Sequence, residues 1–402
     1  MWDFPIKTLA EVCELIVDCE HKTAPTQATG YPSIRTPNIG RGRLLLDGVN
    51  RVSEETYKEW TQRAPPCAND LVLAREAPIG NVAIIPRNLK VCLGQRTVLI
   101  RPDKEKVDPF YLLYLLLGDE LQSRIRSLSN GATVHHLNMA DIRNLSLPTL
   151  PPLPIQRKIA AILSAYNDLI ENNTRRIAIL EEMAQSLYRE WFVHFRFPGH
   201  EKNGMVKSAL GLIPEGWEVV KLGDAIELAY GKALKADTRV AGDIPVYGSA
   251  GIVGYHNEGL IKGPDIIVGR KGNVGSVFWS DVDFFPIDTV FYVRSKVCLH
   301  YIYYNLKAQH FINNDAAVPG LSRNQAYLLP FLLPSELILS QFQEFISPLF
   351  SQINKLTGKN TILRKTRDLL LPQLISGEID VEGLEIAGVD ETGEVETKAI
   401  EV

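Results

Sequence analysis

The chain has 402 residues, of which 45% are hydrophobic and 22% are charged, and its formal net charge at pH 7 is −4. This length and composition are typical of two or three globular domains and exclude a wholly disordered chain. The sequence contains no run of eighteen apolar residues, and its first residues lack the pattern of a signal peptide. It therefore favours a cytoplasmic protein without a membrane segment.

Residues 1–146 form the first predicted globular domain. Its most distinctive segment is DLVLAR at 70–75, followed by IGNV at 79–82. A short apolar run before a glycine is typical of a buried strand that enters a hairpin turn. The glycine spacing matches neither a P-loop nor a dinucleotide-binding fingerprint. Cys13, Cys19 and His21 match no zinc-ligand spacing, so no metal site is predicted.

Residues 147–198 carry the pattern of a first long helix. Four prolines between positions 148 and 154 mark its start, because proline is tolerated in a first turn but not inside a helix. Apolar residues then recur at spacings of three and four, which predicts a coiled-coil-like packing seam. The seam positions are Ile159, Ile162, Tyr166, Leu169, Ile177, Leu180 and Leu187. Residues 199–215 are predicted to be a linker.

Residues 216–333 form a second predicted domain that repeats the first. DIIVGR at 265–270, followed by VGSV at 274–277, matches the motif of the first domain, so Asp265 and Arg270 correspond to Asp70 and Arg75. Thr97-Val98 is echoed by Thr289-Val290. A period near half the chain indicates a duplicated domain, because solenoid repeats are only about 20–50 residues long.

Residues 334–378 carry a second long helical pattern, with seam positions at Leu349, Leu356, Leu363 and Leu370. Aligning Asn173 with Asn360 brings the two seams into register. Pro348 and Pro372 fall inside the pattern, so we expect a kink or a late start at the first and a frayed last turn at the second. Since neither seam can stay exposed to water, the helices are expected to pack against each other, antiparallel. Surface left over on the pair would dock a partner subunit.

Residues 379–402 form an acidic tail that the composition predicts to be disordered. From Glu382 to Val402 there are seven acids and one lysine, so the rest of the chain carries a charge of +2. The overall negative charge therefore does not exclude a basic nucleic-acid-binding face on the folded part.

These patterns predict an α/β (α+β) protein. Two similar globular domains are separated by two long antiparallel coiled-coil-like helices, and the whole is a pseudo-twofold internal repeat.

Several segments, in order along the chain, resemble the specificity subunit of type I restriction–modification systems. In the first domain they are YPSIRTPNI at 31–39 and the 70–82 motif, and in the second they are IPVYG at 244–248 and GIVGY at 251–255. LPIQRKI at 153–159 and WFV at 191–193 resemble the two ends of that family's central helix. LLLPQLISGEI at 369–379 resembles the end of its second helix. The resemblance covers roughly residues 6–380.

This resemblance implies two target-recognition domains, held apart by two helices that also bind two modification (methyltransferase) subunits. The assembled complex of such a family methylates adenine N6 in a bipartite double-stranded DNA site and, with restriction subunits, cleaves unmodified DNA. S-adenosylmethionine, ATP and Mg²⁺ would be bound by the partner subunits, and no cofactor by this chain.

Sequence-specific DNA recognition requires side chains that reach base edges and phosphates. Arginine pairs with guanine, asparagine or glutamine pairs with adenine, and lysine mainly holds phosphates. In the first domain the predicted contacts are Arg35, Asn38, Arg41, Arg43, Arg75, His135 and His136. In the second they are Lys232, Lys235, Arg270, Lys271, Asn273, Arg323 and Asn324. Because Arg75 and Arg270 occupy repeated positions, an ion pair that serves the fold of each domain is the alternative role for both.

Two other classes of function remain open from the sequence. An enzyme with its own catalytic site is disfavoured, since the chain has no adenine-methyltransferase tetrapeptide, no glycine-rich cofactor loop and no nucleophile elbow. We therefore predict a non-catalytic recognition subunit. The remaining alternative is a coiled-coil adaptor with two protein-binding modules, which DNA binding that weakens as salt rises would exclude.

Overall fold

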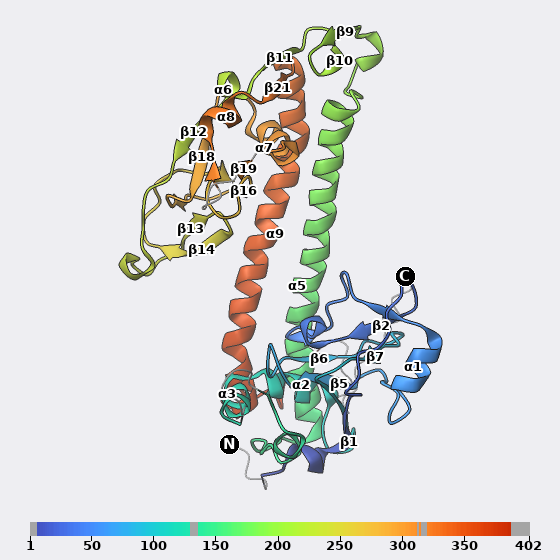
Figure 1. Ribbon diagram of the computed structural model, residues 1–402. Helices are drawn as coiled ribbons and strands as arrows, with labels where there is room; N and C mark the ends of the chain where they lie inside the picture. Colours follow the sequence, from blue (N-terminus) through green and yellow to red (C-terminus); the bar gives the residue numbers. More distant parts are fainter. Residues whose placement is uncertain (1–5, 129–135, 312, 315–319, 387–402) are drawn as a thin grey trace. The chain divides into compact units, whose positions relative to one another are not determined.

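A computed structural model describes residues 6–128, 136–311, 313–314 and 320–386. The chain divides into two units (Figure 1). Unit 1 comprises residues 1–171 and 360–402, and unit 2 comprises residues 172–359. The two long helices α5 (Leu153–Tyr188) and α9 (Glu336–Ser376) each contribute one part to either unit.

Unit 1 contains a five-stranded sheet in the order β1-β8-β5-β6-β3 and a three-stranded sheet in the order β4-β2-β7. The strands are β1 (Cys13–Asp18), β2 (Tyr31–Ile34), β3 (Gly42–Arg43), β4 (Arg51–Val52), β5 (Leu71–Ala74), β6 (Val82–Ile84), β7 (Cys92–Leu93) and β8 (Thr97–Pro102). The helices before α5 are α1 (Glu54–Trp60), α2 (Pro109–Leu117), α3 (Asp119–Ser127) and α4 (Met139–Arg143).

Unit 2 repeats both arrangements, with a four-stranded sheet in the order β12-β18-β15-β16 and a three-stranded sheet in the order β14-β13-β17. These strands are β12 (Glu227–Tyr230), β13 (Ile244–Gly248), β14 (Gly251–His256), β15 (Asp265–Gly269), β16 (Val277–Ser280), β17 (Phe285–Pro286) and β18 (Val290–Arg294). The pairs β2–β7 and β13–β17 are both parallel. The same strand order in both units confirms the duplication.

Unit 2 has further small elements around its sheets. The helices are α6 (Leu222–Ala225), α7 (Leu299–Ala308) and α8 (Arg323–Tyr327). The two-stranded pairs are β9 (Met205–Ser208) with β10 (Gly211–Pro214), β11 (Glu218–Lys221) with β21 (Pro330–Leu333), and β19 (Asn313–Asn314) with β20 (Gly320–Leu321). The hairpin β9–β10 lies in the segment that the sequence predicts to be a linker.

Local sequence explains where the central elements begin. The strands β5 and β15 are buried along their whole length, as their continuous apolar runs predict. Asp108 caps α2, because its carboxylate accepts hydrogen bonds from the amides of Phe110 and Tyr111 at 3.0 and 2.9 Å. Pro109 then occupies the first helical position, where its missing N–H costs nothing.

Each unit has its own hydrophobic core, to which both long helices contribute. In unit 1, the start of α5 supplies Ile159 and Leu163 and the end of α9 supplies Leu374. In unit 2, the end of α5 supplies Tyr188 and the start of α9 supplies Phe342. The start of one helix therefore shares a core with the end of the other, which makes the pair antiparallel, as predicted. None of the helices in the described ranges combines the length and the apolar character that a membrane crossing requires.

The packing seam follows the predicted positions except near the middle of α5. Ile159 and Leu356 are buried, and eight further predicted positions are half-buried: Ile162, Tyr166, Ile177, Leu180, Leu187, Leu349, Leu363 and Leu370. Leu169, however, is 53% exposed, and Ile170 is buried in its place. Leu163 belongs to the core of unit 1, so α5 turns the face that carries Leu163 and Ile170 inward. Neighbouring apolar residues made this face ambiguous in the sequence.

Two further expectations are wrong. The helix α9 begins at Glu336, well before Pro348, so the late start expected at that proline is wrong; Pro372 lies in the last turn of the helix, which ends at Ser376. The tail does not become disordered at residue 379, because Val381 is only 1% exposed in the core of unit 1 and Lys158 donates to the carbonyl of Glu382 at 2.6 Å. Residues 387–402 lie outside the described residues.

The acid that begins the repeated motif has a different environment in each unit. Asp70 accepts hydrogen bonds from Nε and Nη2 of Arg101, at 2.9 and 2.7 Å. Arg294 has the equivalent place in unit 2 by strand register, but it pairs with Glu227 at 3.7 Å. Asp265 is buried without such a partner, and burial raises its pKa to about 7.

We expect Asp265 to make unit 2 less stable as the pH rises. The folded pKa of about 7 lies above the unfolded value of about 3.9, so the folded state holds the proton more tightly. The stabilisation is complete below the unfolded pKa and is lost as the pH rises through 7. Asparagine does not titrate, so the free energy of unfolding of Asp265→Asn should not fall in this way. The difference in free energy of unfolding between Asp265→Asn and the parent should therefore grow by roughly 1 kcal/mol per pH unit between pH 4 and 7. Denaturant unfolding followed by tryptophan fluorescence measures this difference.

Asp237→Asn removes an exposed carboxylate from the same unit and is the matched control. A difference between Asp265→Asn and the parent that stays constant with pH would contradict the assignment.

Candidate nucleic-acid interface

The central strand of each unit ends in the repeated arginine, and the same backbone hydrogen bonds hold it there. The amide of Gly80 donates to the carbonyl of Ala74 at 3.0 Å, and that of Gly275 donates to Gly269 at 2.9 Å. The arginine carbonyls accept from the amides of Leu137 and Leu321, at 3.2 and 2.8 Å respectively. The backbone around Arg75 and Arg270 is therefore built in the same way.

Glycine is required in this turn for a conformational reason. Gly80 and Gly275 have φ values of +81° and +75°, a backbone region that residues other than glycine rarely adopt. The turn closes back on the strand only with this geometry. The glycines noted in the sequence therefore form hairpin-type turns, as predicted.

Strand register identifies the residue that faces each arginine. The amides of Cys19 and Gly231 donate to the carbonyls of Thr97 and Val290, both at 3.2 Å. Asp18 and Tyr230, one residue earlier, are therefore equivalent. The echo of Thr97 in Thr289 is one residue out of step, because Ala74 pairs with Thr97 whereas the equivalent Gly269 pairs with Val290.

In unit 1 the repeated arginine binds groups of its own domain. Arg75 pairs with Asp18 through Nη1 and Oδ2 at 2.6 Å, and its Nε donates to the carbonyl of Leu137 at 2.8 Å. The side chain of Arg75 is 14% exposed. His21 lies on the other side of Asp18, with its Nε2 at 3.3 Å from the carboxylate. Arg75 therefore has the fold-serving ion pair that was its alternative role.

In unit 2 the arginine has no acidic partner among the described residues. The guanidinium carbon of Arg270 lies 4.9 Å from the ring centroid of Tyr230, and Nη1 donates to the carbonyl of Asp288 at 2.9 Å. The guanidinium carbon of Arg323 lies 5.0 Å from the same ring. Tyr230 is 48% exposed. These three residues, Arg270, Tyr230 and Arg323, are called the arginine–tyrosine cluster.

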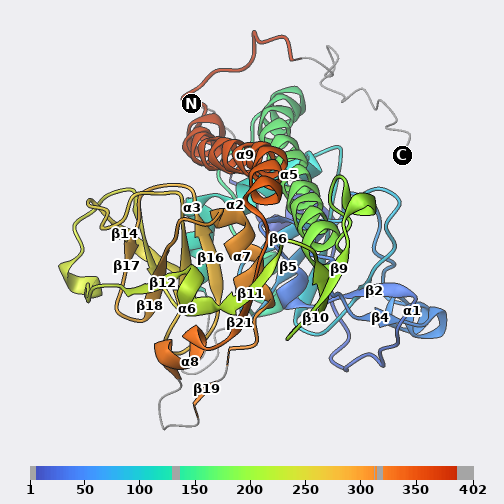
Figure 2. The same cartoon turned by 90° about the horizontal axis from the view of Figure 1, so that it is seen from above.

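The helix α8 positions Arg323. Its last residue, Tyr327, accepts a hydrogen bond from the amide of Leu228 in β12 at 2.9 Å. α8 lies next to α6 (Figure 2). The two pack closely, because a side chain at Gly223 in α6 would collide with Tyr327 in α8. The arginine that starts α8 is thereby held near the end of β12.

Other predicted contacts of unit 1 divide into engaged and exposed residues. Asn38 accepts from the amide of Arg35 at 3.1 Å and donates to the carbonyl of Leu45 at 3.2 Å, so both ends of its amide serve the loop. Arg41 donates to the carbonyl of Leu117 at 2.9 Å, at the end of α2. Arg35 and Arg43 are exposed and His136 is partly exposed, whereas His135 lies outside the described residues.

The predicted contacts of unit 2 are more exposed. Lys232, Lys235, Asn273 and Asn324 are all exposed. Lys271 is partly exposed, with Nζ 4.0 Å from Oδ2 of Asp288, and such a solvent-exposed pair contributes little to stability. Lys271 follows Arg270 directly, so it lies next to the arginine–tyrosine cluster. Unit 2 thus offers more uncommitted positive charge than unit 1 at the equivalent place.

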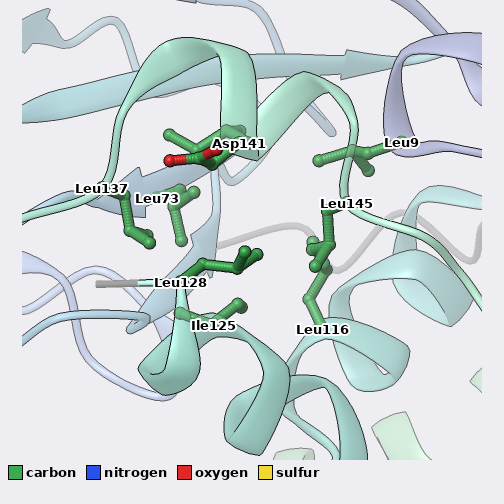
Figure 3. Close-up of a pocket in the computed structure, with 9 residues that line it drawn as sticks. Leu9, Leu73, Leu116, Ile125, Leu128, Leu137, Asp141 and Leu145 are labelled. Atoms are coloured by element: carbon green, nitrogen blue, oxygen red, sulfur yellow. The ribbon is translucent and has the colours of Figure 1, made fainter. Parts of the chain in front are cut away.

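The apolar core of unit 1 leaves a small gap near its helices. A gap beneath α3 and α4 has a volume of about 10 Å³ and is lined by Leu9, Leu73, Leu116, Ile125, Leu128, Leu137, Asp141, Ile142 and Leu145 (Figure 3). A single water needs about 10–15 Å³. This gap therefore holds at most one water molecule and is no ligand site.

The sequence did not single out Tyr230 or Asp18. Each lies at the end of a strand with no motif around it, and their equivalence becomes visible only through strand register. An exposed tyrosine at a strand end that follows an alternating pattern was the only available signal.

Comparisons with known proteins agree with one another. A family model described as the type I restriction modification DNA specificity domain matches residues 1–182 and 214–360. The specificity subunit of the type I restriction enzyme MjaIX from Methanocaldococcus jannaschii is 27% identical over 374 residues, which span 84% of this chain and 83% of that protein. The specificity subunit of the type I restriction enzyme HindI from Haemophilus influenzae is 22% identical over 376 residues, spanning 71% of this chain and 81% of that protein.

A solved structure has a similar fold. The crystal structure of the S subunit of a type I restriction–modification system from M. genitalium superposes with a TM-score of 0.61. The match covers 92% of this chain and 96% of that chain at 17% sequence identity.

Proposed function

The chain belongs to the family of type I restriction–modification DNA specificity proteins, and from this premise we propose that it selects the DNA sequence on which such a complex acts. Residues 1–146 and 216–333 would be its two target-recognition domains. Each would bind one half of a bipartite site in double-stranded DNA.

The observation that carries this proposal is that the two units share the same backbone arrangement around the repeated arginine but place different side chains next to it. Both units hold the repeated arginine with the same hydrogen bonds, yet Arg75 pairs with Asp18 whereas Arg270 stacks on Tyr230. Two readers of different half-sites need a common scaffold and separate contact surfaces. Direct readout through the major groove would then come from the exposed side chains of each surface.

The two long helices have a separate role in this proposal. They would set the distance between the half-sites and dock two modification subunits. Those subunits would flip the target adenine out of the duplex and methylate its N6. S-adenosylmethionine would be bound there, and ATP and Mg²⁺ would belong to restriction subunits where such subunits are present. The chain itself would place the base and perform no chemistry.

The first test is DNA binding by the full chain with its modification subunits. We expect affinity for a duplex with both half-sites to fall as salt rises, because lysine and arginine contacts to phosphates release counterions. A duplex with scrambled half-sites should bind more weakly at every salt concentration. Fluorescence anisotropy between 50 and 300 mM salt measures both.

Binding that does not depend on salt, or no binding to DNA, would favour the adaptor alternative. Methylation by the purified chain with S-adenosylmethionine alone would contradict the non-catalytic assignment.

The second test concerns the spacing between the half-sites. One heptad inserted in the middle of both α5 and α9 preserves the packing seam and lengthens each by about 10 Å. We expect the unread spacer in the methylated sites to grow by up to about three base pairs, since DNA rises 3.4 Å per base pair. The half-sites should stay the same. Mapping of methylated adenines in cells shows both.

Seven residues inserted at the turn between β9 and β10 provide a control of equal length outside the helices. A spacer that is unchanged by the helix insertions, or changed by the hairpin insertion, would contradict the role of the helices.

A further inference from the structure

Two arginines of unit 2 converge on one exposed tyrosine. The guanidinium carbons of Arg270 and Arg323 lie 4.9 and 5.0 Å from the ring centroid of Tyr230. The ring of Phe291 is also close, with its centroid 5.0 Å from that of Tyr230 and 5.9 Å from the guanidinium carbon of Arg270. The two guanidinium groups therefore share one aromatic ring.

Their charges are not balanced by an acid in the part of the chain that the structure describes. Arg270 donates to a carbonyl, that of Asp288, at 2.9 Å. The Nε of Arg323 is buried and has no hydrogen-bond partner. A buried donor without an acceptor is unfavourable, and so are two like charges on one ring. An anion that accepts from the terminal nitrogens of the two guanidinium groups offsets the second of these costs.

We propose that Arg270 and Arg323 together bind a phosphate of the DNA backbone, and that Tyr230 is the residue that positions them. The inference rests on the proposed function of this chain in DNA recognition. A guanidinium that lies on an aromatic ring has few conformations and presents the N–H groups at its edge. Such a fork matches phosphate oxygens. Arginine can also pair with guanine in the groove, and the salt dependence of binding separates the two roles.

The equivalent place in unit 1 excludes the same contact there. Asp18 occupies the position of Tyr230 and neutralises Arg75 at 2.6 Å. The two domains therefore hold the backbone of their half-sites differently, and the arginine–tyrosine cluster is specific to the half-site of unit 2.

The test is the salt dependence of DNA binding by the chain assembled with its modification subunits. Each phosphate contact contributes about −0.9 to the slope of log affinity against log salt concentration. Arg270→Gln and Arg323→Gln should each make the slope shallower by about one. Arg270→Lys should keep most of it. These changes should be the same for a duplex with the intact half-site of unit 2 and for one with that half-site scrambled.

The positioning role of Tyr230 has its own pair of variants. Tyr230→Phe keeps the ring and should leave the slope unchanged, whereas Tyr230→Leu should make it shallower. Arg294→Gln is the matched control, because Arg294 lies 5.3 Å from the ring of Tyr292 in the same sheet but is paired with Glu227 at 3.7 Å. It should not change the slope. Thermal melting of each variant verifies folding, and if Arg270→Gln does not fold, Arg323→Gln and Tyr230→Leu still decide the question.

Affinity lost only on the intact half-site, at an unchanged slope, would overturn the phosphate assignment and make the arginines base readers. The proposed function would survive that result. Equal effects of Arg294→Gln and Arg323→Gln would also overturn the assignment. A parent complex without salt-dependent DNA binding would instead mean that the proposed function itself is wrong.

Discussion

Each long helix has an apolar stripe that must be buried, and this burial is the constraint on which the rest of the structure depends. The start of α5 completes the core of unit 1, and its end completes the core of unit 2. The helix α9 does the same in the opposite direction. Neither unit has a complete core without both helices. A change in the stripe would therefore affect folding, whereas changes on the outer surface leave the cores intact.

Polar contacts add specificity to this packing in unit 1. Arg367 donates to Oδ1 of Asn167 at 2.6 Å, and the amide nitrogen of Asn167 donates to the hydroxyl of Tyr114 at 2.8 Å. These bonds join α9, α5 and α2 in one fixed register, because each donor has one well-placed acceptor. A purely apolar seam tolerates sliding more easily. The helix pair can therefore serve as a fixed frame for a recognition domain.

The duplicated domains show how one scaffold carries two surfaces. Backbone bonds from Gly80 and Gly275 make the same turn, and this turn puts an arginine at the end of the central strand. One position on the neighbouring strand then determines whether the arginine is paired with an acid. Asp18 forms an ion pair with Arg75, whereas Tyr230 contacts Arg270 through its ring and leaves the positive charge unpaired. Such a substitution changes the contact surface without changing the fold.

Much of this could be predicted from the sequence, because it rests on local patterns. The buried strands, the glycine turns and both long helices follow from apolar runs, glycines and periodicity. The misplaced Leu169 shows where periodicity fails, since two adjacent apolar residues leave the buried face undecided. The expected late start at Pro348 is wrong, because the helix already begins at Glu336. The equivalence of strand ends was harder to predict from the sequence. The bulge in β1 shifts its pairing by one residue, so Asp18 and Tyr230 are recognised as equivalent only from the strand pairing in the structure.

The individual contact residues could be predicted only as a class. Arg41, Asn38 and Arg75 are predicted DNA contacts, and in the structure their side chains bind a carbonyl, an amide and a carboxylate of their own domain. Long-range partners such as Leu117 are invisible without the fold. Residue type indicates what a side chain can bind, whereas burial and neighbours determine what it does bind.

The central claim is that the two domains read DNA independently on a common frame. Its most direct measurement is a map of methylated adenines in cells whose chain carries residues 1–146 of a relative with a different specificity. The account predicts that one half-site changes to that of the relative, while the other half-site and the spacer stay the same. A map in which both half-sites change, or neither does, would contradict it.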